Sequence, residues 1–208
     1  VKNSKILIAG GTGFIGSNIL WEKSVKDNYD KDKKQVFLLG GDYQERLDFT
    51  ENKLNTIFLR QSFLLSQKAQ NEILIPSSYG CVAGDIDMDP CKTGTKPKIS
   101  FCGTKNSHPI RNVLFSLLEN SDEIECNFDF IESPCNGYAD IEIEKKVMRF
   151  NKNLETSEFT FCPRGNGNFS IRFYEALMSG RIPVVLNTDN ELPFNKYINW
   201  NEVCVVSD

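Results

Sequence analysis

Residues 161–185 read FCPRGNGNFSIRFYEALMSGRIPVV. Apolar runs predict a strand at 159–163 and another at 182–186, and between them lie a loop rich in Gly and Asn and a helix over 170–179 that Gly180 ends. This order is typical of an α/β domain with a parallel sheet, in which ligands bind at the carboxyl ends of the strands. We therefore expect the loop to face a ligand.

The side chains of this segment suit a diphosphate with an attached ribose. Ser170 is expected to cap the helix, where free N–H groups and the helix dipole attract anions. Arg164 and Arg172 would add one or two guanidinium groups. Glu175, one turn into the helix, is well placed to accept ribose hydroxyl groups. The alternative is that Arg172 and Glu175 form an ordinary ion pair on a helix surface.

Strands and helices alternate along the rest of the chain. Strands are predicted at 5–9, 35–40, 55–59, 72–76, 98–103, 125–131 and 203–206, and helices over 14–25, 108–120 and 140–154. The expected apolar helix positions are Ile110, Val113, Leu114, Leu117 and Leu118 in the helix over 108–120, and Phe173 and Leu177 in the helix over 170–179.

This alternation predicts an α/β fold with Rossmann-like parallel sheets and two domains. Residues 77–97 contain Ser, Gly, Asp and Pro but few long apolar side chains, and they form the expected linker. We predict a short Rossmann-like domain over 1–90 and a second domain over 96–208.

Composition excludes several classes of protein. The chain has 208 residues, 40% of them hydrophobic and 25% charged, which is typical of a globular protein. Its net charge of −4 argues against general nucleic-acid binding. We expect no transmembrane segment, because no apolar run reaches about 18 residues. Seven cysteines without a CxxC pair, and one histidine, argue against a zinc site and favour mostly free thiols.

Residues 10–16 read GGTGFIG and follow a predicted strand at the start of a predicted helix. Gly10, Gly13 and Gly16 allow a tight turn and the close approach of a phosphate. The segment resembles the start of an extended short-chain dehydrogenase or nucleotide-sugar epimerase, which implies NAD(P) binding. The Tyr-x-x-x-Lys pair of that family is missing from its expected place, because the only such spacing, at 29–33, falls in a charged loop. A glycine turn that only packs the helix against the strand is the alternative.

Residues 161–185 closely resemble the donor site of exostosin-like glycosyltransferases (glycosyltransferase family 47). The shared features are Pro-Arg-Gly, Ser-x-Arg, Glu-Ala-Leu and Gly-x-Ile-Pro-Val, followed by Leu192-Pro193-Phe194 and Asn199-Trp200. The resemblance covers residues 70–208 and implies a GT-B arrangement of two facing Rossmann-like domains. It also implies inverting transfer of a sugar from a nucleotide sugar, with a UDP-sugar as the expected donor, to a glycan or glycoprotein, without a required cofactor or metal.

The resemblance also assigns a donor site by position. Its members would be Arg164, Gly165, Ser170, Arg172 and Glu175, with Arg111 as a second phosphate partner. Inverting transfer requires a general base. His108 at a helix start and Asp85 in the acidic run over 85–89 are candidates, and Asp42 and Asp87 also stay open. The alternatives are a capping role for His108 and a flexible acidic linker around Asp85.

Three functions remain open from the sequence. The first is the glycosyltransferase, whose partners would be a nucleotide-sugar donor and a glycan or glycoprotein acceptor. The second is an NAD(P)-dependent nucleotide-sugar epimerase or dehydratase, and the third is a truncated, non-catalytic glycosyltransferase, which the short first domain favours. Free cysteines favour the cytoplasm, whereas the family resemblance favours the Golgi or secretory pathway.

Overall fold

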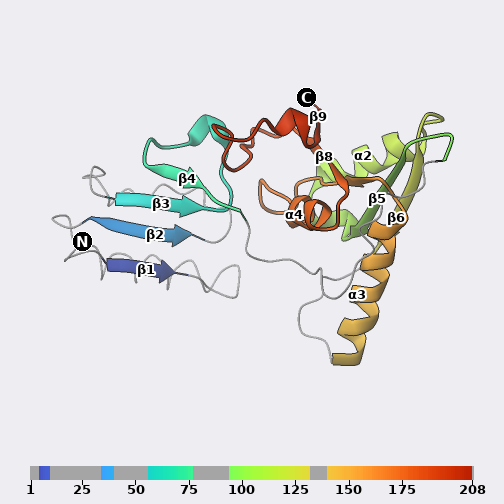
Figure 1. Ribbon diagram of the computed structural model, residues 1–208, viewed down its shortest axis with the longest axis horizontal. Helices are drawn as coiled ribbons and strands as arrows, with labels where there is room; N and C mark the ends of the chain where they lie inside the picture. Colours follow the sequence, from blue (N-terminus) through green and yellow to red (C-terminus); the bar gives the residue numbers. More distant parts are fainter. Residues whose placement is uncertain (1–4, 10–33, 40–55, 77–93, 132–139, 208) are drawn as a thin grey trace. The chain divides into compact units, whose positions relative to one another are not determined.

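A computed structural model describes residues 5–9, 34–39, 56–76, 94–131 and 140–207 (Figure 1). The chain divides into two compact units. The first contains Val1–Pro76 and Asp189–Ile198, and the second contains Ser77–Thr188 and Asn199–Asp208. Each unit has its own parallel sheet. Most of the predicted linker over 77–97 lies outside the described residues.

The first unit contains a four-stranded sheet in the order β1-β2-β3-β4. Its strands are β1 (Lys5–Ala9), β2 (Gln35–Leu39), β3 (Thr56–Arg60) and β4 (Glu72–Leu74), and each pairs in parallel with its neighbour. All four lie where the apolar runs predicted strands. A mostly buried ion pair joins β3 to β4, with 2.7 Å between Arg60 Nη1 and Glu72 Oε1.

Residues Asp189–Ile198 belong to this first unit, although they follow the last helix of the second unit in sequence. The amide of Leu65 donates to the carbonyl oxygen of Asp189 at 2.7 Å, and the amide of Ser66 donates to Asp189 Oδ1 at 3.1 Å. Lys68 pairs with Glu191 at 2.5 Å. Polar contacts across more than 120 residues of sequence therefore attach this segment to the 3-10 turn at Leu65–Gln67.

The second unit contains a five-stranded sheet in the order β6-β5-β7-β8-β9, in which all pairs are parallel. Its elements are β5 (Lys98–Gly103), α2 (Pro109–Glu119), β6 (Glu125–Phe130), α3 (Asp140–Glu155), β7 (Phe159–Phe161), α4 (Ile171–Met178), β8 (Ile182–Leu186) and β9 (Val205–Ser207). The chain passes from β5 to β6 on one side and then to β7 on the other side of β5. The carboxyl ends of β5 and β7 therefore flank the topological switch point.

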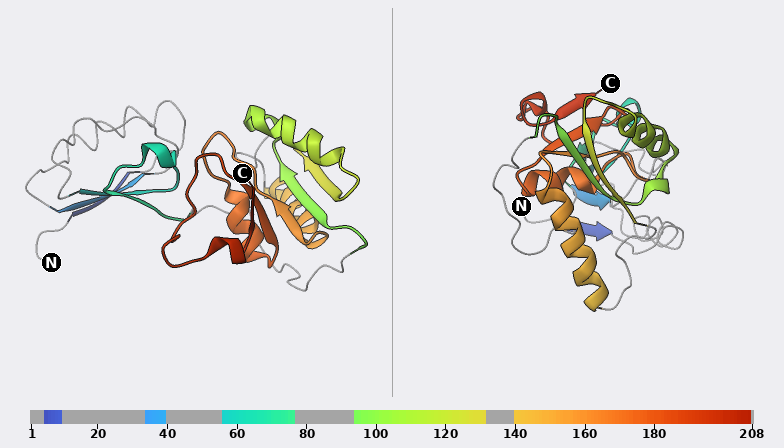
Figure 2. Two further views of the ribbon diagram at one scale, coloured as in Figure 1. Left: turned by 90° about the horizontal axis from the view of Figure 1, so that it is seen from above. Right: turned by 90° about the vertical axis from the view of Figure 1, so that its right-hand side faces the viewer.

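Helix α2 covers one face of this sheet, and α3 and α4 cover the other (Figure 2). Successive residues of a strand point to opposite faces. Accordingly, Phe101 packs against Phe115 of α2, whereas Cys102 packs against Phe150 and Leu154 of α3. The second unit is thus a three-layer α/β domain, as the alternation of strands and helices predicted.

The orientation of α2 agrees with the prediction at Leu114 and Leu118, which pack against the core, but differs from it at Val113 and Leu117. Arg111 and Phe115 are its buried residues, whereas Val113 and Leu117 are 60% and 64% exposed. Phe115 is fully buried and lies within 5.6 Å of the ring centroids of Phe101, Phe128, Phe130 and Phe161. Because this aromatic contact buries more apolar area than Val113 and Leu117 could, it determines which face of the helix meets the sheet.

The last strand also begins later than predicted. The amides of Val203 and Cys204 both donate to the carbonyl oxygen of Trp200, which keeps these residues in the turn that follows Trp200–Glu202. The four cysteines in the described ranges are free, as expected for these positions: Cys102, Cys126, Cys162 and Cys204. Among the helices that the structure describes, none is long and apolar enough to cross a membrane.

Candidate functional site

The predicted donor residues of the second unit gather at the carboxyl edge of its sheet. The loop after β5 contains the 3-10 turn Lys105–Ser107, and the loop after β7 leads into α4. Arg164 and Gly165 lie in the second of these loops, and Arg172 and Glu175 lie in the first turns of α4. The site is therefore at the switch point of an open parallel sheet, where such folds bind ligands.

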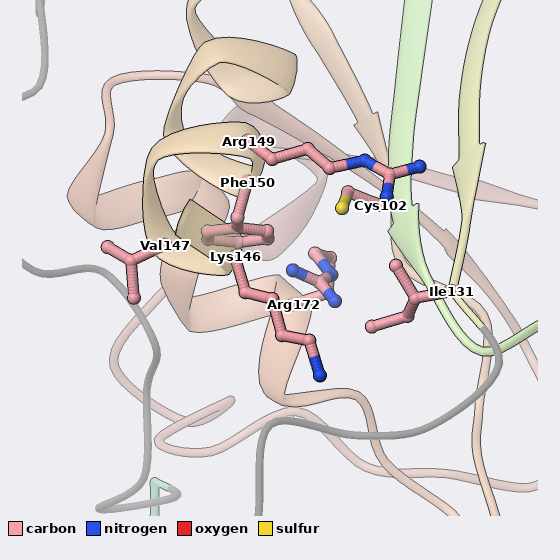
Figure 3. A pocket seen from close by; sticks show the side chains of 7 residues that line it. All are labelled: Cys102, Ile131, Lys146, Val147, Arg149, Phe150 and Arg172. Carbon is pink, nitrogen blue, oxygen red and sulfur yellow. The ribbon is translucent and has the colours of Figure 1, made fainter. Parts of the chain in front are cut away.

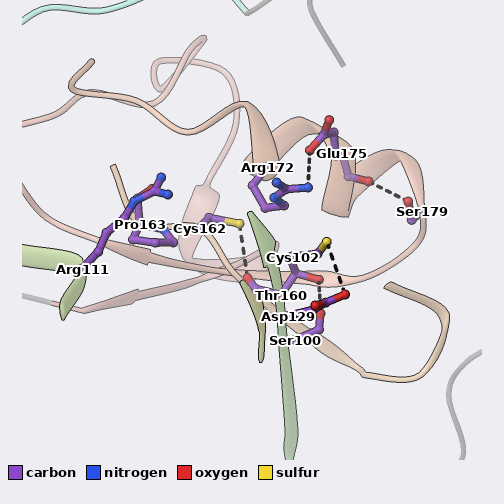
Figure 4. A network of polar contacts seen from close by, with 10 residues as sticks. All are labelled: Ser100, Cys102, Arg111, Asp129, Thr160, Cys162, Pro163, Arg172, Glu175 and Ser179. Atoms are coloured by element: carbon purple, nitrogen blue, oxygen red, sulfur yellow. Dashed lines mark hydrogen bonds and ion pairs between the residues drawn. The ribbon is translucent and has the colours of Figure 1, made fainter. Parts of the chain in front are cut away.

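Arg172 and Glu175 form a mostly buried ion pair (Figure 4). Arg172 Nη1 lies 3.1 Å from Glu175 Oε2, and the two side chains are only 18% and 3% exposed. The expected alternative, an ordinary surface pair, is therefore wrong. Buried ion pairs have a high desolvation cost and add little stability, so their presence at a sheet edge favours a functional role.

The guanidinium of Arg172 is held by two further neighbours. It lies over the ring of Phe150, with 4.2 Å between the guanidinium carbon and the ring centroid. A Cβ atom at Gly103, the last residue of β5, would lie 3.0 Å from Arg172 Nη2 and equally close to the Phe101 ring. The absence of a side chain at Gly103 thus leaves the space that the guanidinium fills.

Helix α4 begins and ends largely as the sequence predicted. Ser170 occupies the N-cap position, but its side chain makes no capping hydrogen bond, so the predicted hydroxyl cap is wrong. The carbonyl oxygen of Ser170 accepts from the amide of Phe173 at 3.2 Å. Gly180 ends the helix with φ of 64°, and the amide of Arg181 donates to the carbonyl of Ala176 at 2.8 Å. This is the Schellman arrangement that a terminal glycine allows.

The buried face of α4 also differs from the prediction. Phe173 faces the core as expected, but its companions there are Glu175 and Ala176, and Leu177 is only partly buried. The Phe173 ring packs against Trp200, with 5.2 Å between the ring centroids. A carboxylate therefore takes a position that an apolar residue would usually occupy.

Arg111 is 8% exposed and directs its guanidinium at backbone carbonyl groups. Its Nε donates to the carbonyl of Arg164 at 2.7 Å, its Nη1 to that of Thr104 at 2.7 Å, and its Nη2 to that of Pro163 at 2.9 Å. Burial, together with the positive charge of Arg172, lowers the pKa of Arg111 to about 10. The guanidinium therefore remains charged at neutral pH.

His108 caps α2. Its Nδ1 accepts a hydrogen bond from the amide of Ile110 at 3.2 Å, and Pro109 occupies the first helical position. The capping role considered for His108 is thus confirmed. Burial, followed by the charges of Arg164 and Arg111, lowers the pKa of His108, which favours the neutral ring. Its role as a general base stays a prediction.

A pocket lies beside Arg172 at the carboxyl ends of β5 and β6 (Figure 3). It contains about 380 Å³ of empty space, part of it open to solvent. Its walls combine apolar and cationic side chains: Cys102, Ile131, Lys146, Val147, Arg149, Phe150 and Arg172. Arg149 also pairs with Asp129.

The sequence analysis did not identify the α3 side of this pocket. Lys146, Arg149 and Phe150 are spaced three and four apart, so they share one face of α3. That spacing was available in the sequence. It carried no sign of a site, because only the packing of α3 against β5 brings this face beside Arg172.

Several predicted site residues lie outside the described ranges. They are Gly10, Gly13 and Gly16 of the glycine-rich segment, and Asp85 with the rest of the acidic run. Their roles stay predictions, as does the boundary between the domains over 1–90 and 96–208. Within the ranges that the structure describes, no group of three or more His, Cys, Asp and Glu side chains could hold a metal ion.

The fold and the site together indicate the kind of ligand that this protein is suited to bind. A Rossmann-like parallel sheet presents two loops and the start of a helix at its switch point, with arginines and a buried carboxylate between them. This combination is suited to a phosphate-bearing ligand with hydroxyl groups.

Comparison with known proteins identifies the family. The family model described as the Exostosin GT47 domain matches residues 93–208, which is more than half of the chain. The chain belongs to this family, as the resemblance of residues 161–185 predicted.

Similar proteins include exostosins and a plant protein. Exostosin-1 of Bos taurus is 41% identical over 65 residues, covering 31% of this chain and 9% of that protein. Exostosin-1b of Danio rerio is 41% identical over 59 residues, covering 28% and 8%. A probable glycosyltransferase of Arabidopsis thaliana is 29% identical over 115 residues, covering 54% and 19%. The chain therefore matches only a small part of each of these relatives.

Proposed function

We propose that this chain supplies the donor-binding domain of a glycosyltransferase. The enzyme transfers a sugar with inversion from a nucleotide sugar, with UDP as the nucleotide, to a glycan or glycoprotein. Family membership and the names of the relatives support the reaction class. The single observation that supports the site most strongly is the buried pair of Arg172 and Glu175 at the start of α4.

The diphosphate binds between the loop after β7 and the start of α4. Arg172, Arg164 and the first amide groups of α4 supply positive potential there. When the sugar leaves, negative charge develops on the departing diphosphate, and groups that are already in place stabilise it. Arg172 is suited to this role because Phe150 and Glu175 fix its guanidinium before a ligand arrives.

Glu175 binds the ribose in this proposal. A carboxylate offers about four acceptor positions, so it can accept from ribose hydroxyl groups while it pairs with Arg172. The pocket beside Arg172 then receives the base, because it has apolar walls at Ile131, Val147 and Phe150 and is continuous with Arg172. One arginine thus contacts both parts of the nucleotide.

The acceptor hydroxyl requires a general base in an inverting transfer. His108 and Asp85 stay the candidates. The lowered pKa of His108 favours the neutral form that a base needs, but its Nδ1 is engaged with the amide of Ile110. Because Nδ1 carries the lone pair that accepts this bond, Nε2 holds the ring proton, and His108 can act as a base only after it gives up the bond to Ile110.

Thermal unfolding with and without UDP, GDP and NAD tests this proposal. A ligand at 100 times its Kd stabilises the folded state by about 2.7 kcal/mol. We expect UDP to raise the Tm with or without EDTA, since no metal takes part. Glu175→Gln should weaken UDP binding about tenfold, the equivalent of losing one charged hydrogen bond.

Glu123→Gln is the matched control, because Glu123 is exposed and lies outside the site. It should leave UDP binding unchanged. Stabilisation by NAD that is insensitive to Glu175→Gln would instead support the epimerase and the glycine-rich segment over 10–16. The absence of a shift with every nucleotide would overturn the proposal.

A further inference from the structure

Arg111 connects two loops that are about 60 residues apart in sequence. Thr104 directly follows β5, and Pro163 and Arg164 lie in the loop after β7. One guanidinium accepts no hydrogen bonds but donates three, at 2.7 to 2.9 Å, to the carbonyl oxygens of these residues. Such charge-assisted bonds are stronger and more directional than those between neutral groups.

The pairing of β5 with β7 ends before either loop begins. The paired residues of the two strands are Ile99 with Phe159 and Ser100 with Thr160. The hydroxyl groups of Ser100 and Thr160 also lie 3.2 Å apart at this level of the sheet (Figure 4). Beyond these residues the backbone ladder between β5 and β7 ends, and the guanidinium of Arg111 connects the loops that follow the two strands.

The loop after β7 packs directly on Arg111. A Cβ atom at Gly165 would lie 3.5 Å from Arg111 Nη2, so the backbone runs along the guanidinium. In a trans peptide the N–H group points away from the preceding carbonyl. The bonds from Arg111 to the carbonyls of Thr104 and Arg164 therefore also fix the direction of the next peptide N–H groups, those of Lys105 and Gly165.

We propose that Arg111 is a positioning residue, which holds the loops after β5 and β7 in the arrangement that binds the diphosphate, and that it does not itself bind phosphate. The proposal rests on the proposed function for the identity of the ligand. It replaces the phosphate contact that the family resemblance suggested for Arg111. Three of the five N–H donors of its guanidinium bind carbonyl oxygens, and the burial of Arg111 keeps the other two from the ligand, which meets Arg164 and the start of α4 instead.

Replacement of Arg111 by lysine separates the two roles. A lysine would keep the positive charge, and it can bind phosphate as a point charge, but it cannot make three bonds in a fixed fork. If Arg111 positions the loops, Arg111→Lys and Arg111→Met should weaken UDP binding to a similar extent, about tenfold or more. If Arg111 binds phosphate, Arg111→Lys should retain most of the affinity.

Uridine, which has no phosphate, provides the second readout. A positioning role for the phosphate loops predicts that both variants bind uridine as wild type does, whereas general damage to the domain would weaken uridine and UDP alike. Affinities are measured by isothermal titration calorimetry on the full chain. Lys145→Met, at an exposed position of α3, is the control for loss of a cation and should change neither affinity.

Amide hydrogen exchange tests the loops without any ligand. We expect both Arg111 variants to exchange about tenfold faster than wild type in peptides covering residues 104–107 and 163–166, and Lys145→Met to leave these rates unchanged. Arg111→Gln, which keeps two N–H donors, replaces Arg111→Met if that variant does not fold.

The outcomes distinguish this proposal from the proposed function. Retention of UDP affinity by Arg111→Lys, equal loss of uridine and UDP binding, or unchanged exchange in both loops would each overturn the positioning role. If wild type binds no UDP, the proposed function fails, and the exchange rates of the loops still decide whether Arg111 holds them.

Discussion

At the scale of single residues, the site consists of charged groups in unusual surroundings. Glu175 is 3% exposed at its side chain, Arg111 is 8% exposed, and Arg172 is enclosed by Phe150 and the space that Gly103 leaves. The sequence predicted Arg172 and Glu175 as site residues from their position after the Gly-rich loop. It could not predict the contacts of Arg111, because carbonyl acceptors belong to the backbone and leave no residue type to recognise.

At this scale, His108 makes the stability of the folded chain depend on pH. Its pKa is lowered in the folded state, so as the pH falls the unfolded chain takes up the proton first. The stability that the neutral ring contributes is therefore present above about pH 6.5, the ordinary pKa of histidine. It is lost as the pH falls below that value, because burial and the charges of Arg164 and Arg111 disfavour the protonated ring, whose Nδ1 also cannot accept from the amide of Ile110.

The substitution His108→Asn tests this expectation, since asparagine also caps helices but does not titrate. Urea unfolding at pH 7.5 and pH 5.5 should show that wild type loses more stability on acidification than His108→Asn does. An equal loss in both proteins would contradict the assigned contact between His108 and the start of α2.

At the scale of elements, the boundaries of strands were predicted better than the orientation of helices. Short apolar runs next to Gly or Pro identify β5, β7 and β8, because buried parallel strands are apolar on both faces. The helix α2 has apolar residues around most of its surface, so periodicity alone selected Val113 and Leu117. The four aromatic neighbours of Phe115 come from β5, β6 and β7, and the sequence does not reveal that they converge.

Alanine substitutions in α2 test its orientation. Phe115→Ala should lower the free energy of unfolding by about 3 to 5 kcal/mol, because it leaves a cavity inside the aromatic cluster. Leu117→Ala on the exposed face should change it by less than about 0.5 kcal/mol. Chemical denaturation of both variants measures the difference. Similar losses for the two variants would mean that α2 is rotated from the orientation described.

At the scale of the whole molecule, the sequence predicted two parallel sheets but not how the chain is shared between the two units. The segment Asp189–Ile198 carries the Leu-Pro-Phe motif, which the sequence analysis assigned to the second domain. Its contacts with Leu65, Ser66 and Lys68 place it in the first unit. These contacts are polar and depend on loop geometry, so they leave no periodic pattern that a sequence analysis could detect.

The family of the chain, by contrast, was predicted correctly from residues 161–185. The motifs that carry the resemblance include a strand end, a glycine-rich loop with an arginine, a helix start and a carboxylate one turn later. All of these are consecutive in sequence, so they can be recognised together.

A crystal structure of the full chain with bound UDP tests the central claim most directly. We predict that the diphosphate lies at the start of α4 within hydrogen-bond distance of Arg172, and that a carboxylate oxygen of Glu175 accepts from the ribose. The base should occupy the pocket beside Phe150, and Arg111 should keep its three bonds to carbonyl groups. UDP bound away from Arg172 and Glu175, or at residues 10–16, would contradict the account.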